Sequence, residues 1–355
     1  MNLVTGASQA DRNAWTEPGV EDLGGGVYRI PLPLPGDALK AVNIYAIASD
    51  AGVYLIDAGM ATPGAAEQLT GALKTIGYEL GDVRNLFITH IHRDHYTLAM
   101  ELRTSLRGQI MIGEGEQENL QAILGVAEGT TEHGQVVRMR RCGADDLVRL
   151  LAQNSPGKQE SPGAGLPWGE PDRWLADGTV LDLQSRTLTT IATPGHTVGH
   201  VVYHDEGNAA LFSGDHVLPH ITPSIGFQPV VARAALADYL ASLRLMLTLP
   251  DTRLLPAHGP VSPSTHARVG ELLSHHEDRL AQMLEVVDTD TTAYTVAKAV
   301  PWTRRERKFA DLDPMNQVLA TGETGAHLEV LALRGQLTRH TLDDGTDLYS
   351  RPPRA

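Results

Sequence analysis

Residues 85–95 read NLFITHIHRDH, a short apolar strand pattern that runs directly into imidazole and carboxylate groups. His90, His92, Asp94 and His95 fall within six residues. We expect them on an irregular turn just past the strand end, where a rigid sheet holds functional groups within reach of solvent. Imidazole and carboxylate bind zinc and iron, and no cysteine lies nearby to indicate a structural thiolate site. The four ligands could serve two adjacent metal ions.

Three further candidate ligands lie downstream in similar settings. They are His196 in TPGHTVGH (193–200), Asp215 in SGDHV (213–217) and His258 in PAHGP (256–260). Each follows an apolar strand pattern and a turn of small residues, and the adjacent glycines let the backbone approach closely. Two metal ions about 3.5–4 Å apart, with one bridging carboxylate and a water, would use all seven residues. The pattern therefore predicts a dinuclear rather than a mononuclear centre.

The surrounding sequence predicts a layered α/β fold. Runs rich in Val, Ile and Tyr predict strands at 27–34, 42–48, 53–56, 85–89 and 253–255, and a β pattern over 180–217. Apolar residues at helical spacing predict helices at 65–76, 98–106 and 234–247. Residues 155–170 are rich in Pro and Gly and predict an irregular loop or lid. This order of strands and helices indicates a mixed layered architecture.

The chain changes character after residue 264. Helical patterns cover 267–287, 293–299 and 323–333, and strand signals return at 337–342 and 347–351 around a turn at 343–345. Three helices followed by a hairpin predict a small, mostly helical, winged-helix-like domain over residues 265–355. The first domain is predicted to cover residues 1–264.

Composition narrows the class of protein. The 355 residues include 29 Lys and Arg against 43 Asp and Glu, a formal net charge of −14. This charge repels phosphate backbones, so a nucleic acid is not the expected partner. The single cysteine, Cys142, cannot form an internal disulfide, and neither a membrane-helix pattern nor a signal pattern is present. We therefore expect a cytoplasmic protein that makes no membrane contact.

The motifs HIHRDH, TPGHTVGH, SGDHV and PAHGP, in this order, resemble the metallo-β-lactamase superfamily across about residues 24–264. The resemblance implies an αββα sandwich that binds two metal ions. It assigns His90, His92 and His196 to the first metal, Asp94, His95 and His258 to the second, and Asp215 to the bridge. The helix after HGPV and the segment GAHLEVLALRGQL (325–337) resemble the winged-helix extension of the β-lactamase-like subfamily that includes an endoribonuclease.

Two metal ions lower the pKa of a shared water to about 7, which supplies a bridging hydroxide nucleophile at neutral pH. We therefore expect a dinuclear metal-dependent hydrolase of a small activated carbonyl compound, a thioester or ester first and a lactone next. Asp94 would help the second metal to steady the hydroxide and the leaving group. Zinc is the metal expected first, with iron or manganese as alternatives. Two other functions stay open: an endoribonuclease using the same hydroxide, and a non-catalytic, metal-stabilised binding module.

Residues around the metals are predicted next. Asp57 in LIDAG is a candidate to orient an imidazole N–H, with capping of its own turn as the alternative. Candidate substrate contacts come from the loop after Asp215, from the Pro- and Gly-rich segment, and from beside the first motif: His220, Phe227, Trp168 and Tyr96.

The remaining polar residues receive structural roles. We expect His200, His204 and His216 to be structural, His275 and His276 to be solvated on a helix, and Cys142 to be a bystander thiol. The run TRRERK (303–308) is expected to be a solvated face, because residues 265–355 carry 11 Lys and Arg against 14 Asp and Glu. The C-terminal domain would then dock on the hydrolase or on a second subunit, forming a homo-oligomer.

Overall fold

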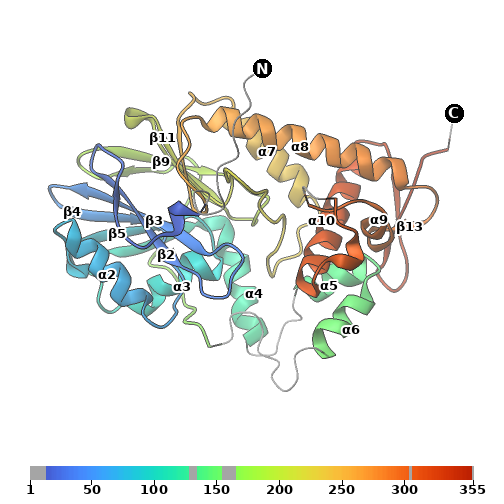
Figure 1. Cartoon of the computed structure of the whole chain (residues 1–355), viewed down its shortest axis with the longest axis horizontal. Helices are drawn as coiled ribbons and strands as arrows, with labels where there is room; N and C mark the ends of the chain where they lie inside the picture. Colours follow the sequence, from blue (N-terminus) through green and yellow to red (C-terminus); the bar gives the residue numbers. More distant parts are fainter. Residues whose placement is uncertain (1–12, 128–133, 154–164, 304–305, 354–355) are drawn as a thin grey trace.

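The computed structural model describes residues 13–127, 134–153, 165–303 and 306–353. Two β-sheets lie at the left of the view, and α8 runs from above them toward the right, where α9 and α10 lie (Figure 1). Within the described ranges, no helix is long and apolar enough to cross a membrane. The sheets and the helices beside them confirm the predicted layered α/β fold.

The first sheet has seven strands in chain order, antiparallel from β1 to β4 and parallel from β4 to β7. Its strands are β1 (Glu21–Asp22), β2 (Val27–Pro33), β3 (Ala41–Ser49), β4 (Gly52–Ile56), β5 (Val83–Ile88), β6 (Gln109–Gly113) and β7 (Arg173–Leu175). Successive side chains point to opposite faces of a strand. In β5, Leu86 and Ile88 join the apolar cluster on the helix side, whereas Phe87 joins the cluster between the sheets.

The second sheet has five strands in the order β12-β11-β10-β9-β8, and only β11 and β12 pair in parallel. Its strands are β8 (Val180–Asp182), β9 (Thr187–Ala192), β10 (Val201–Asp205), β11 (Ala210–Gly214) and β12 (Arg253–Pro256). Tyr45 of the first sheet meets Phe212 of the second, with ring centroids 5.4 Å apart. The two sheets therefore share a buried core.

Helices cover both outer faces. The first sheet carries α2 (Ala65–Thr75), α3 (Arg93–Leu102) and α4 (Gln117–Ala127), and the second carries α7 (Ala235–Met246) and α8 (Thr265–Val286). Leu69 and Leu98 pack in the first helix–sheet cluster, and Tyr239 and Val269 pack in the second. Short 3₁₀ turns are η1 (Ala14–Thr16), η2 (Leu80–Asp82), η3 (Glu114–Glu116), η4 (Glu206–Asn208) and η5 (Phe309–Asp311).

Helix α3 differs from the prediction for 98–106, because it begins at Arg93 and ends at Leu102. His92 has an extended backbone and caps the helix, and Asp94 lies in the first turn. A carboxylate is favourable at this end of a helix, where unpaired N–H groups leave a positive partial charge. Asp94 and His95 are therefore helical residues rather than part of an irregular turn.

The C-terminal region contains β13 (Thr291–Thr292), α9 (Ala293–Ala299), α10 (Pro314–Leu333), β14 (Thr338–Thr341) and β15 (Asp347–Ser350). The three strands form one sheet in the order β13-β15-β14, and the predicted hairpin is β14–β15. Helix α10 begins nine residues before the predicted 323–333, since Asp313 accepts a hydrogen bond from the Asn316 N–H and Pro314 occupies the first turn. Gly322 lies inside this helix and weakens its apolar pattern, but a Cβ there would come 3.0 Å from Arg138 Cζ.

Two helices form in a segment for which the sequence predicted no helix or strand: α5 (Gly134–Arg141) and α6 (Asp145–Gln153). Both pack against α10. Helices α7, α8 and α9 also contact α10. Helices from both sides of residue 264 therefore pack together. The boundary at residue 264 and the winged-helix assignment stay predictions. Of the predicted loop at 155–170, residues 155–164 lie outside the described ranges and 165–170 form neither helix nor strand.

Candidate metal centre

Four chain segments bring the seven predicted ligands together at one edge of the sandwich. His90 follows β5, and His92, Asp94 and His95 lie at the start of α3. His196 lies between β9 and β10, Asp215 follows β11, and His258 follows β12. Their ligand atoms form two compact groups: His90, His92, His196 and Asp215 in one, and Asp94, His95 and His258 in the other.

The first group is built of three imidazoles. His196 Nε2 lies 3.2 Å from His90 Nε2 and 3.0 Å from His92 Nδ1. Backbone holds the outer nitrogens of two of them: His196 Nδ1–H donates to the Ser224 carbonyl at 2.6 Å, and His92 Nε2–H donates to the Phe227 carbonyl at 2.7 Å. The outer nitrogen of His90 lies 3.1 Å from Thr89 Oγ1. Because the outer nitrogens of His92 and His196 carry the protons, the nitrogens of these two residues that face each other present lone pairs. A cation between them removes their repulsion.

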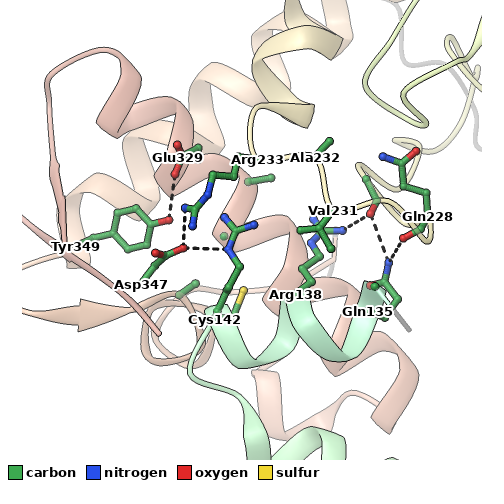
Figure 2. Close-up of a pocket in the computed structure, with 16 residues that line it drawn as sticks. Gln135, Arg138, Cys142, Gln228, Val231, Ala232, Arg233, Glu329, Asp347 and Tyr349 are labelled. Atoms are coloured by element: carbon green, nitrogen blue, oxygen red, sulfur yellow. Dashed lines mark hydrogen bonds and ion pairs between the residues drawn. The ribbon is translucent and has the colours of Figure 1, made fainter. Parts of the chain in front are cut away.

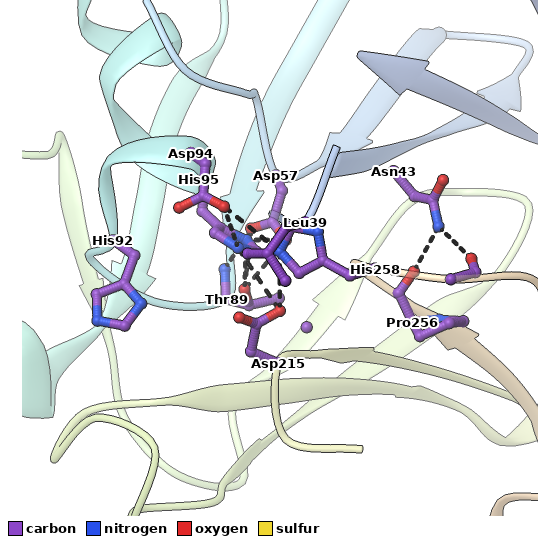
Figure 3. A network of polar contacts seen from close by, with 12 residues as sticks. Leu39, Asn43, Asp57, Thr89, His92, Asp94, His95, Asp215, Pro256 and His258 are labelled. Carbon is purple, nitrogen blue, oxygen red and sulfur yellow. Dashed lines mark hydrogen bonds and ion pairs between the residues drawn. The ribbon is translucent and has the colours of Figure 1, made fainter. Parts of the chain in front are cut away.

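The second group combines a carboxylate with two imidazoles (Figure 3). Asp94 Oδ2 lies 3.3 Å from His258 Nε2 and 3.8 Å from His95 Nε2. His258 Nδ1–H donates to the Ala41 carbonyl at 2.7 Å, and His95 Nδ1–H donates to Asp57 Oδ2 at 2.9 Å. Both Nε2 atoms are therefore unprotonated acceptors when the histidines are neutral, as metal ligation requires.

Asp215 lies between the two groups. Its Oδ2 is 3.4 Å from His196 Nε2, whereas its Oδ1 is 3.4 Å from His258 Nε2 and 3.7 Å from His95 Nε2. One carboxylate thus presents one oxygen to each group. This is the arrangement expected of a bridging ligand.

Buried polar atoms without partners test whether a metal fits. Among the described residues, His95 Nε2, His258 Nε2 and Asp215 Oδ1 are buried and make no hydrogen bond. Buried polar atoms of native proteins nearly always have partners. These three converge on one another in the second group, so a single cation there would satisfy all of them. The donor set therefore fits two divalent ions.

Burial and neighbouring charges shift the pKa values of the residues in the centre. Burial lowers the pKa of His196 to about 3, with His92 contributing in the same direction. Burial would also lower the pKa of His95, but Asp57, Asp94 and Asp215 raise it to about 10. Burial would raise the pKa of Asp215, yet His258 and His95 hold it below its usual range. The Asp215 carboxylate therefore stays ionised and requires cations beside it, either protonated imidazoles or metal ions.

Asp57 lies behind the second group and orients it. This residue has a left-handed backbone (φ +61°) at the end of β4, a conformation that Asp and Asn tolerate better than most side chains. Its Oδ1 accepts the Thr89 N–H at 2.8 Å, and Oδ2 accepts from His95 Nδ1. Thr89 Oγ1 donates to the same carboxylate at 3.0 Å and lies 3.1 Å from His90 Nδ1. Asp57 therefore reaches an imidazole N–H directly, in addition to fixing the turn at residue 89.

Three supporting residues were not predicted. His200, expected to be only structural, accepts the Asp215 N–H at 3.1 Å and donates from Nδ1 to Thr193 at 2.9 Å. Asn43 of β3 donates to the carbonyls of Pro256 and Gly259 at 2.9 and 2.8 Å, on either side of His258. His200 lies within the motif TPGHTVGH, so its place beside the metal centre could have been predicted from the sequence. Asn43 lies more than 200 residues from its partners, and no sequence pattern indicates its contacts.

The third is Glu116, a fully buried carboxyl group beside the ligand loops. It accepts hydrogen bonds from the Thr197 hydroxyl, from Asn119 Nδ2 at 2.7 Å and from the Ile91 N–H at 3.4 Å. Burial raises the pKa of Glu116 to about 7. The residue connects the loop of His90 and His92 with the loop of His196.

The predicted substrate contacts differ in burial and in their position relative to the centre. Tyr96 is fully buried, its hydroxyl donates to the Gly169 carbonyl at 2.6 Å, and its ring stacks on Trp168 at 6.2 Å. Contrary to the prediction, Tyr96 is a core residue rather than a substrate contact. His220 is exposed and lies outside both ligand groups. Phe227 touches the centre through its carbonyl.

Among the other histidines, His276 corrects the sequence analysis. It is buried rather than solvated, because it faces α10, where its Nδ1 lies 3.1 Å from His327 Nε2. His275 is exposed, and His204 and His216 are buried and belong to neither ligand group. Cys142 is also buried, and burial raises the pKa of its thiol to about 11. Of the charged run at 303–308, residues 304 and 305 lie outside the described ranges.

Comparison with known proteins places these features in a family. The sequence model of the metallo-beta-lactamase superfamily matches residues 38–258. The lactamase-like protein ptaB of Pestalotiopsis fici is 25% identical over 274 residues, which cover 75% of this chain and 66% of ptaB. The beta-lactamase-like protein 2 homolog of Caenorhabditis elegans is 24% identical over 313 residues, covering 88% of this chain and 82% of the relative.

Another relative is the atrochrysone carboxyl ACP thioesterase of Aspergillus fumigatus, 24% identical over 260 residues. These cover 72% of this chain, but the chain spans only 47% of the thioesterase. A crystal structure of a metallo-beta-lactamase family protein from Thermus thermophilus is 25% identical, with a TM-score of 0.70 over 93% of this chain and 100% of that chain. The family match covers more than half of the sequence and includes all seven clustered residues, so this chain belongs to the metallo-beta-lactamase superfamily.

Proposed function

We propose that the chain is a dinuclear metal-dependent hydrolase of a small activated carbonyl compound, a thioester or ester first and a lactone next. One observation carries the proposal: the two oxygens of Asp215 face two separate groups of ligand atoms. His90, His92 and His196 would hold one metal, and Asp94, His95 and His258 the other. Asp215 would bridge them.

Two divalent ions, when bound, supply Lewis-acid polarisation of a carbonyl oxygen and a water whose pKa falls to about 7. The chain's own residues orient the ligands. Backbone carbonyls fix His92, His196 and His258 in the tautomers that leave a lone pair toward the centre. Asp57 does the same for His95. Because each ring is held on its outer nitrogen, little reorganisation is needed when metal binds.

The substrate class and the metal are inferred from a relative and from the ligand atoms. One relative is named as a thioesterase that acts on an acyl carrier protein, which favours a thioester as the first substrate class to test. The ligand atoms are all nitrogen and oxygen, a set that suits zinc and also accommodates iron and manganese. Zinc is our first candidate.

The test combines metal analysis with hydrolysis. Purified protein is analysed for bound elements and is assayed on a thioester, a lactone and a short single-stranded RNA. We expect two metal ions per chain with thioester or lactone turnover. The control variant His340→Gln changes a histidine on the exposed strand β14 and should behave like wild type. Failure to bind metal after loading would contradict the ligand set, and cleavage of RNA alone would replace the carbonyl substrate with a phosphodiester.

A further inference from the structure

A narrow cleft lined by arginines lies between α5, the loop at 226–233, α10 and β15 (Figure 2). We call it the arginine cleft and define it by Arg138, Arg141, Arg233, Gln228 and Asp347. Its volume is about 40 Å³. A single water needs about 10–15 Å³ on this scale, so the cleft has room for one small anionic group.

The charges of the cleft do not cancel. Arg141 and Arg233 both donate to the same oxygen of Asp347, at 3.2 and 3.1 Å, so one carboxylate serves two guanidinium groups. Arg138 donates to the carbonyls of Gly226 and Gly322 at 2.8 and 2.7 Å. It forms no ion pair with a carboxylate of the described ranges, although the charge of Glu323, which pairs with Arg279 at 3.7 Å, acts on it. The other acid of the cleft, Glu329, is paired by both oxygens with Arg339. A positive surplus remains, in a chain whose net charge is −14.

Gln228 lines the cleft, and the far end of its side chain is only partly paired. Its Oε1 accepts the Val198 N–H at 2.7 Å and Asn119 Nδ2 at 2.8 Å, which fixes which end of the amide is oxygen. Its Nε2 is buried and has no hydrogen-bond partner among the described residues. Buried N–H groups are nearly always paired. An acceptor from outside the chain would complete this one.

The cleft shares a wall with the metal centre. Gly226 and Gln228 line the cleft, and Phe227 between them accepts the hydrogen bond from His92. Ser224 in the same loop accepts the hydrogen bond from His196. A group bound in the cleft therefore lies directly behind the loop that orients two of the predicted ligands.

We propose that the arginine cleft binds a phosphate or carboxylate group carried by the substrate of the metal centre. Guanidinium groups donate paired N–H bonds that match the oxygens of these anions. The proposal rests on the proposed hydrolase function and extends it to substrates with an anionic group away from the scissile bond. Thioesters of coenzyme A meet this requirement, since their thiol portion carries phosphates.

Arg233 is the residue to change, because its side chain is 40% exposed and Arg141 continues to pair with Asp347 when it is lost. The graded variants Arg233→Gln and Arg233→Glu remove and reverse its charge. Arg149→Gln is the matched control: it removes the same charge from α6, where Arg149 is exposed and pairs with Asp146 outside the cleft.

The kinetic arm compares acetyl-coenzyme A with the neutral thioester acetyl-N-acetylcysteamine on the metal-loaded full chain. We expect Arg233→Gln to raise the KM of the coenzyme A thioester by about 10-fold or more relative to that of the neutral one, the usual effect of losing one charge-assisted hydrogen bond. Arg233→Glu should raise it further, and Arg149→Gln should leave the ratio unchanged. An unchanged ratio in both Arg233 variants would overturn the proposal.

The binding arm separates failure of the cleft from failure of the hydrolase. Inorganic phosphate is titrated by calorimetry into wild type and the three variants. If no thioester is hydrolysed, the proposed function fails, and the anion site stands only if phosphate binding weakens in Arg233→Gln but not in Arg149→Gln. Phosphate that binds all four proteins equally is held at the metal centre or at the surface, which overturns the arginine cleft as an anion site. Phosphate binding that depends on Arg233, with an unchanged KM ratio, assigns the cleft to a free anion and refutes the link to substrate.

Discussion

The substitution Asp57→Asn tests how the protein orients one metal ligand. In the structure, Oδ1 of Asp57 accepts the Thr89 backbone N–H, so the oxygen of the introduced asparagine must stay on that side. The amide NH₂ of the new side chain then replaces Oδ2, the acceptor of the His95 Nδ1–H. Two donors cannot face each other, so His95 must move its proton to Nε2. That nitrogen is the one that faces Asp94 and Asp215.

The expected loss is selective. Replacing a partner that orients a metal-binding histidine costs about 10- to 100-fold in metal affinity, or about 1.4–2.8 kcal/mol. Because asparagine tolerates the left-handed conformation of residue 57, the variant should fold. We expect one metal ion to bind with an affinity near that of wild type and the other to bind more weakly, by about the factor above.

Equilibrium dialysis with elemental analysis measures both affinities, and circular dichroism checks folding. The control Asp172→Asn makes the same change at an exposed ion pair with Arg103, far along the chain from the ligands. Wild-type affinity for both ions in a folded Asp57→Asn protein would refute the tautomer argument.

Three other perturbations test the centre and its surroundings. Asp215→Ala should leave the protein folded with fewer than two metal ions per chain and without hydrolysis, and two bound ions with retained activity would remove Asp215 as the bridge. Gly195→Ala places a Cβ 2.4–2.6 Å from atoms of Tyr239 at φ +137°, so chemical denaturation should show a loss of more than about 2 kcal/mol; a smaller loss would mean that α7 shifts freely. The third perturbation concerns His276 and His327. Burial, and then the nearby His327, lower the pKa of His276 to about 2. Burial lowers the pKa of His327 to about 3. Their contribution to stability is therefore complete above the unfolded pKa of about 6.5 and falls by up to about 1.4 kcal/mol per histidine for each pH unit below it. Denaturation from pH 7.5 to pH 5 should show a shallower decline in His276→Gln/His327→Gln than in wild type, and parallel declines would contradict this account.

Local pattern predicted much of the fold. The predicted strands at 42–48 and 253–255 correspond to β3 and β12, and the helix at 293–299 corresponds to α9. The residues of each of these elements carry the apolar periodicity, or are bounded by the turn residues, that predict its type and its ends. Helix α3 was misplaced because its first turn is made of polar residues, the candidate metal ligands Asp94 and His95 among them, which hide the apolar repeat. Helix α10 was shortened because small residues such as Gly322 replace apolar ones where Arg138 approaches.

The site was predicted as a set of side chains but not as a network. Its seven residues converge because each lies in a short motif at the end of a strand or the start of a helix. The residues that hold them act across long separations. Asn43 contacts Pro256 across 213 residues, and Tyr96 was misassigned because its partner Gly169 lies 73 residues away. Such pairings depend on the final packing and leave no periodic trace in the sequence.

The apolar cluster on the outer face of the second sheet extends far into the C-terminal region. It includes Val202 and Leu211 in the sheet, Tyr239 of α7, Leu272 of α8 and Leu328 of α10, and it extends to Tyr349 of β15. Unfolding of the C-terminal helices would therefore expose apolar side chains of β10 and β11, the strands next to the candidate ligands His196 and Asp215. We therefore expect the second sheet and the C-terminal helices to unfold as one cooperative unit, so that slow amide hydrogen exchange in α10 is coupled to that of β10 and β11.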